Sequence, residues 1–201
     1  MVAGRTVVHS LGQAGGLGTS ARSRPAARHH AWDDLSRWHQ HPGASQGGGR
    51  GKKGVDSQQR DVREALGRSR GGYGTKACVI ADGRGRAIAF ALAPGQAHEL
   101  PLAPGLLDCL PDVPGWIVGD RGFASDAFRE RIWNLGAHPA IPPRRTDPPV
   151  ACPQWIYINR HLVENLWARL KEWRAVATRY EKTARSFLGV LCLAATTDWL
   201  K

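Results

Sequence analysis

The chain has 201 residues, with 28 Lys and Arg against 17 Asp and Glu, which gives a formal net charge of +11 and a pI near 10.3. This length supplies one hydrophobic core, and the positive charge favours a phosphate-bearing partner, although GC-rich coding DNA read in any frame also yields Arg and Gly. The four cysteines are far apart, without a C-x2-C pair, and we interpret them as reduced thiols. No stretch of about 18 consecutive apolar residues and no signal-like start occurs, so we expect the protein to act in the cytoplasm, away from membranes.

The N-terminal third has no regular pattern. Residues 1–75 hold fifteen of the 24 glycines, and the run 47–54, GGGRGKKG, has neither helical nor strand periodicity. We therefore predict an irregular or disordered leader over residues 1–66, followed by one α/β domain over residues 67–201.

The next part of the chain predicts a hairpin, a helix and a strand. Apolar runs at 76–81 and 86–93 flank Asp82 and Gly83, which predicts an antiparallel hairpin and explains Asp82 by turn chemistry. Residues 99–110 indicate a helix, and residues 116–119, WIVG, indicate a buried strand that ends on Asp120. A carboxylate just past a strand is a common position for an α/β active site, although an N-cap or turn role accounts for Asp120 equally well.

The C-terminal part alternates helices with one more strand. We predict a helix over 125–135 with Ser125 as its cap, a short strand over 137–141 that ends at two prolines, and a final helix over 183–200. Together with the upstream strands, this pattern predicts a mixed sheet with helices on its faces.

One helix carries a polar ridge beside an apolar stripe. In YINRHLVENLWARLK, the side chains of Arg160, Glu164 and Lys171 project at about 0°, 40° and 20° around the helix axis. The apolar stripe lies beside the ridge, on the arc from about 200° to 340°, and consists of Leu162, Val163, Leu166, Trp167, Leu170 and Trp173. The ridge favours a functional carboxylate between two cations, but a surface ion pair worth about 0.2–0.5 kcal/mol explains Arg160 and Glu164 as well.

Taken together, these features resemble the catalytic part of insertion-sequence transposases of the DDE type, in the branch of insertion sequences four and five. The matching segments, in the family's order, are GRSRGGYGTK, AIAFALAPGQAHE, GDRGFASDAF, AIPPRR, the Y-x2-R-x3-E-x6-K helix that starts at Tyr157, and ATRYEKTARSFLGVLCLAA. The resemblance implies an RNase H-like mixed sheet flanked by helices. It also implies that Asp120 is the second catalytic aspartate and Glu164 the catalytic glutamate.

The same resemblance implies metal-dependent phosphoryl transfer on double-stranded DNA, at the terminal repeats of an insertion sequence and at its target. Asp120 and Glu164 would hold Mg²⁺ or Mn²⁺ in a two-metal arrangement. The predicted DNA contacts are Tyr157, Arg160, Lys171, Arg144 and Arg145, and the protein is expected to form a homodimer on DNA.

The first catalytic aspartate departs from the family pattern. Counting back from residues 37–41, RWHQH, leads to Trp32, and the nearest acids are Asp33 and then Asp34, with no apolar strand to position either. We take Asp33 as the candidate and expect the sheet to lack its first strand. Two hypotheses follow: an active transposase, or a truncated, catalytically inactive DNA-binding remnant of one. A ribonuclease of the same fold is a third interpretation.

Overall fold

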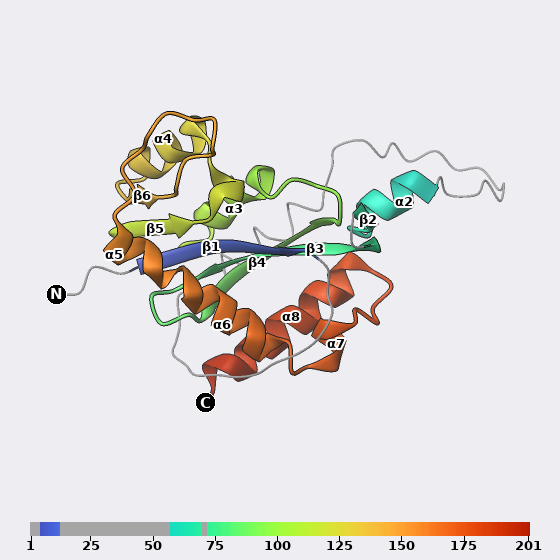
Figure 1. Cartoon of the computed structure of the whole chain (residues 1–201). Coiled ribbons are helices and arrows are strands. Elements are labelled where there is room, and N and C mark those ends of the chain that lie inside the picture. Colours follow the sequence, from blue (N-terminus) through green and yellow to red (C-terminus); the bar gives the residue numbers. More distant parts are fainter. Residues whose placement is uncertain (1–4, 13–56, 70–71) are drawn as a thin grey trace.

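Six strands form one mixed sheet in the structure, a computed structural model that describes residues 5–12, 57–69 and 72–201 (Figure 1). The strands are β1 (Arg5–Gly12), β2 (Gly67–Ser69), β3 (Gly72–Ala81), β4 (Ala87–Pro94), β5 (Trp116–Gly119) and β6 (His138–Ala140). Their order is β2-β3-β1-β5-β6, with β4 also paired to β3. Strand β1 is antiparallel to β3 and parallel to β5, and β5 is parallel to β6. This topology is the predicted RNase H-like mixed sheet.

Strand β1 occupies the centre of the sheet. Val7 pairs with Ala81 of β3 on one side and with Val118 of β5 on the other. The prediction that the first strand is missing is therefore wrong. We sought that strand just before residues 37–41, whereas the β-branched run from Thr6 to Val8, which favours a strand, lies much nearer the N-terminus.

Strand β1 and helix α2 (Ser57–Arg63) both fall within residues 1–66, which we predicted as an irregular leader. The sheet thus includes residues from before position 67. Residues 1–4 and 13–56 lie outside the described residues, and the division of the chain at residue 67 stays a prediction.

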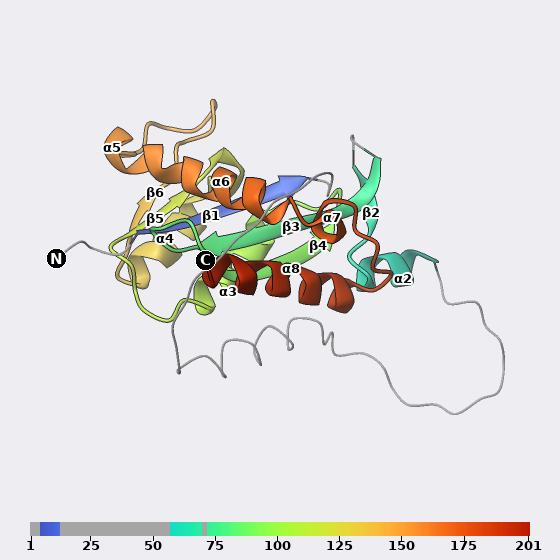
Figure 2. The same ribbon diagram turned by 90° about the horizontal axis from the view of Figure 1, so that it is seen from below.

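Helices cover both faces of the sheet (Figures 1 and 2). One face carries α5 (Gln154–Tyr157), η3 (Ile158–Arg160), α6 (His161–Leu170), α7 (Arg174–Ala177) and α8 (Ala184–Trp199). The other face carries η1 (Leu100–Leu102), α3 (Ala103–Asp108), η2 (Arg121–Phe123) and α4 (Asp126–Asn134). Among the described residues, no helix is both long enough and apolar enough to cross a bilayer.

Each face has its own hydrophobic core, because successive side chains of a strand point to opposite faces. On β5, Val118 packs in the core beneath α6 and α8, and Ile117 packs in the core beneath α3 and α4. The first core includes Val163, Leu166, Trp167, Leu170, Phe187 and Leu191. Four members of the predicted apolar stripe are thus buried, as expected.

Most predicted elements are confirmed. Strands β3 and β4 form the predicted hairpin, and Asp82 Oδ1 accepts hydrogen bonds from the backbone N–H groups of Arg84 and Arg86 at 2.9 and 3.0 Å. Strand β5 covers the predicted residues. The predicted helix over 99–110 is instead a 3-10 turn, η1, followed by the short α3, and each has a proline in its first turn, where proline is tolerated.

Candidate functional site

Asp120 lies just past the last residue of β5. Its backbone stays extended, with φ −79° and ψ 179°. Because side chains alternate along a strand, Asp120 belongs to the same face of the sheet as Val118. Helices α5 and α6 cover that face. Asp120 Oδ1 accepts a hydrogen bond from the Gly122 N–H at 2.7 Å. The predicted N-cap role of Asp120 is therefore confirmed. The hydrogen bond from Gly122 fixes this half-buried carboxylate at the end of the strand.

Glu164 lies on the same side of the sheet. Segments α5, η3 and α6 follow one another across β5 and β1 (Figures 1 and 2). Glu164 Oε1 is 2.6 Å from Arg160 Nη2, with side chains that are 47% and 34% exposed. The predicted approach of Arg160 and Glu164 is confirmed, but a pair this exposed adds only about 0–1 kcal/mol to stability. The contact therefore fits both the functional and the surface interpretation.

Tyr157 lies between the two carboxylate-bearing elements. Burial raises the pKa of its hydroxyl above the usual value; Arg160 partly opposes the rise, and the negative charge of Asp120 adds to it. The hydroxyl therefore stays protonated and can donate a hydrogen bond. The helix that carries Tyr157, α5, contacts β5.

A further carboxylate, which we did not predict, lies beside the Asp120 turn. A Cβ atom on Gly122 would lie 2.8 Å from Asp120 Oδ1 and 3.8 Å from Glu99 Oε2, so both carboxylates flank the same glycine. Lys76 Nζ on β3 is 2.6 Å from Glu99 Oε1 and also donates to the Ala97 carbonyl at 2.6 Å. The sequence could have indicated Glu99 and Lys76 as candidates, because each is the last residue of a segment that resembles the family.

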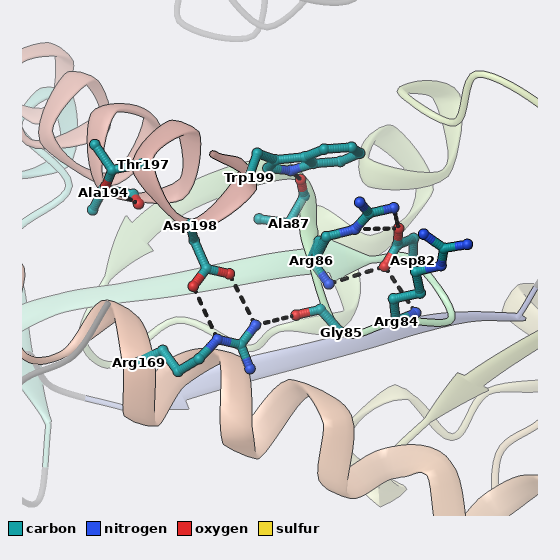
Figure 3. Close-up of polar contacts among 10 residues, drawn as sticks. All are labelled: Asp82, Arg84, Gly85, Arg86, Ala87, Arg169, Ala194, Thr197, Asp198 and Trp199. Carbon is teal, nitrogen blue, oxygen red and sulfur yellow. Dashed lines mark hydrogen bonds and ion pairs between the residues drawn. The ribbon is translucent and has the colours of Figure 1, made fainter. Parts of the chain in front are cut away.

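An ion pair between half-buried Arg169 and fully buried Asp198 links α6 to α8 (Figure 3). Arg169 near the end of α6 donates from Nε and Nη2 to the two carboxylate oxygens of Asp198, each at 2.9 Å. Asp198, near the end of α8, is only 1% exposed. Arg169 Nη2 also donates to the Gly85 carbonyl at 2.7 Å, and this contact joins both helices to the β3–β4 turn.

The β3–β4 turn touches α6 at a second point. Gly85 has a positive φ of 72°, and a Cβ atom there would lie 2.9 Å from the Leu162 carbonyl oxygen in the first turn of α6. Contacts at Leu162 and Arg169 lie on either side of Glu164 along the helix. The turn therefore determines where Glu164 sits relative to the sheet.

Three other predicted site residues lie just after α6 or in the loop before α5. Lys171 directly follows α6, seven residues beyond Glu164 and about 10 Å further along the helix axis. Arg144 and Arg145 are exposed in the loop between β6 and α5, where the Arg144 N–H donates to Asp147 Oδ2 at 2.9 Å. Asp33 and its neighbour at position 34 lie outside the described residues.

The carboxylates suit a hard divalent cation only in part. Asp120 and Glu164 offer the oxygen donors that Mg²⁺ prefers, but no group of three or more His, Cys, Asp or Glu residues able to hold a metal ion occurs in the described part of the chain. Strand β1, RTVVHSLG, contains no acid. Val8 pairs with Gly119, so His9 is the position level with Asp120.

Comparison with known proteins identifies the family. Two family profiles, both described as transposase DDE domain, match residues 117–201 and residues 48–149. A protein of Brucella ovis named "Putative transposase for insertion sequence element IS6501" is 34% identical over 89 residues, which are 43% of this chain and 68% of that protein. No solved structure matches. DDE domains belong to enzymes of the nuclease and strand-transferase type and generally use divalent metal ions. The chain is therefore a member of the transposase DDE domain family.

Proposed function

We propose that the chain is the catalytic portion of a DNA transposase that cleaves and joins strands at the ends of an insertion sequence. The observation that supports this function is the placement of Asp120 and Glu164 on elements that lie on one side of the sheet. Family membership supports the reaction class, and in this proposal Asp120 and Glu164 are two of the carboxylates that the reaction needs.

In this proposal Asp120 and Glu164 hold Mg²⁺ or Mn²⁺, and the substrate phosphate and water complete the coordination. When bound, such ions activate a nucleophile and stabilise the leaving oxygen in phosphoryl transfer. Tyr157 donates a hydrogen bond to the DNA backbone, and Arg160 contacts phosphate while keeping Glu164 ionised. Lys171, Arg144 and Arg145 extend the contact, and two copies of the chain assemble on the DNA.

A nicking assay tests this function. The wild-type chain is incubated with supercoiled DNA that carries the ends of the element, in Mg²⁺ or Mn²⁺, beside the Asp120→Asn and Glu164→Gln variants. We expect nicking by the wild type, no nicking by either variant, and none in EDTA. Arg131→Ala, which alters an exposed ion pair on α4, is the matched control and is expected to keep wild-type activity. Nicking that survives in both carboxylate variants would refute the proposed site.

A second function, an inactive DNA-binding remnant, is favoured by the composition of β1. The strand beside β5 carries no carboxylate, and Asp33 is the candidate that remains from the sequence. If Asp33 supplies the first catalytic carboxylate, Asp33→Asn abolishes nicking as completely as Asp120→Asn does.

The remnant hypothesis predicts a gain of function. A wild-type chain that binds DNA without nicking it is expected to acquire Mn²⁺-dependent nicking in the His9→Asp variant, because position 9 is level with Asp120 in the parallel pair of β1 and β5. His9→Asn is the control that changes the residue without adding a carboxylate. The remnant hypothesis fails if the wild type nicks DNA.

A further inference from the structure

The junction between α6 and α8 concentrates positive charge. Residues 171–185 include five Lys and Arg against two acids. Arg179 turns inward and donates to the carbonyls of residues 64 and 65 at 2.8 and 3.4 Å, near α2. Arg174, Lys182 and Arg185, which we name the α7 patch, are exposed instead.

Some exposed cations on α2 and α4 are paired with acids, and within the residues that the structure describes the members of the α7 patch are not. Arg60, Arg63 and Arg131 are each within 2.9 Å of a carboxylate oxygen. Within the described ranges, no ion pair involves any member of the α7 patch. A solvated surface usually mixes both signs of charge, so three exposed cations in a segment with a surplus of three positive charges favour an anionic partner.

The position of the patch adds to this argument. Arg185 lies in the first turn of α8, a helix of 16 residues with no acid in that turn, and Lys182 lies just before it. Cations at the positive end of a helix dipole are disfavoured in the free protein and become favourable beside a polyanion. Tyr180, 60% exposed, adds an aromatic side chain to the same segment.

We propose that the α7 patch binds the phosphates of duplex DNA away from the cleaved bond, an inference that rests on the proposed transposase function. The patch follows the far end of α6, whose ten residues extend about 15 Å. At 3.4 Å per base pair this length equals about four to five base pairs. The patch thus lengthens the DNA footprint beyond Arg160. It adds affinity for DNA that does not depend on the base sequence.

The test is the salt dependence of duplex binding. Affinity for a 30-base-pair duplex is measured by fluorescence anisotropy between 50 and 200 mM KCl, for the wild type and for Arg174→Ala/Lys182→Ala/Arg185→Ala. Each lost phosphate contact lowers the slope of log K against log salt by roughly 0.9, so the triple variant is expected to lose about 2.7 from the slope and at least about tenfold in affinity at 100 mM. Circular dichroism checks that the variant is folded.

The matched control removes the same charge elsewhere. Arg60→Ala/Arg63→Ala/Arg131→Ala changes three paired cations on α2 and α4, and we expect its slope to stay close to that of the wild type. If both triple variants show the same slope, the α7 patch is not a DNA contact, although the proposed function stands. If the wild type itself does not bind duplex DNA, the proposed function fails as well.

Discussion

Replacing Arg169 with alanine is expected to destabilise the protein by about 3–5 kcal/mol. The substitution leaves the Asp198 carboxylate, 1% exposed, without the two hydrogen bonds that compensate for its burial (Figure 3). It also removes the donor to the Gly85 carbonyl. The free energy of unfolding, measured by urea titration with circular dichroism, checks this expectation.

An exposed pair provides the control for Arg169. Arg131 Nη2 contacts Asp108 Oδ1 at 2.5 Å, but the two side chains are 47% and 57% exposed, so Arg131→Ala is expected to cost at most about 1 kcal/mol. The double variant Arg169→Met/Asp198→Leu should recover much of the loss, because it leaves no buried charge unpaired. Equal costs for Arg169→Ala and Arg131→Ala would contradict the structural role of the buried pair.

Gly85→Ala is expected to destabilise the protein by about 2–4 kcal/mol, through two separate effects. A positive φ of 72° disfavours any residue with a Cβ atom, and that atom would lie 2.9 Å from the backbone oxygen of Leu162. Either the turn or α6 must then shift, and a shift of α6 moves Glu164. Thermal and urea unfolding measure the cost.

The same substitution at another glycine should have the opposite sign. Gly189 lies within α8, and a Cβ atom there meets nothing within 4 Å. Gly189→Ala is therefore expected to stabilise the protein by about 0.5–1 kcal/mol, since alanine loses less backbone entropy in a helix. Destabilisation by both substitutions to a similar degree would show that the contact with Leu162 does not account for the effect at Gly85.

Local patterns in the sequence predicted where several of the candidate residues lie in the fold. Asp120 was expected at the end of a strand and lies there, because four apolar residues followed by a turn are sufficient to identify β5. Arg160 and Glu164 were expected on one face of a helix and are in contact. Lys171, in contrast, follows the end of α6 instead of continuing the ridge, since the helix ends at Leu170.

The sequence by itself determined the hairpin, the strand before Asp120 and the amphipathic helix, which depend on residues a few positions apart. It also carried the family resemblance. Only the tertiary structure decided that β1 lies at the centre of the sheet, that Glu99 flanks the Asp120 turn, and that Gly85 and Arg169 position α6. The physical reason is that periodicity and turn chemistry act within one segment. Strand order and buried ion pairs instead depend on which distant segments bury their surfaces together, and no local pattern records that choice.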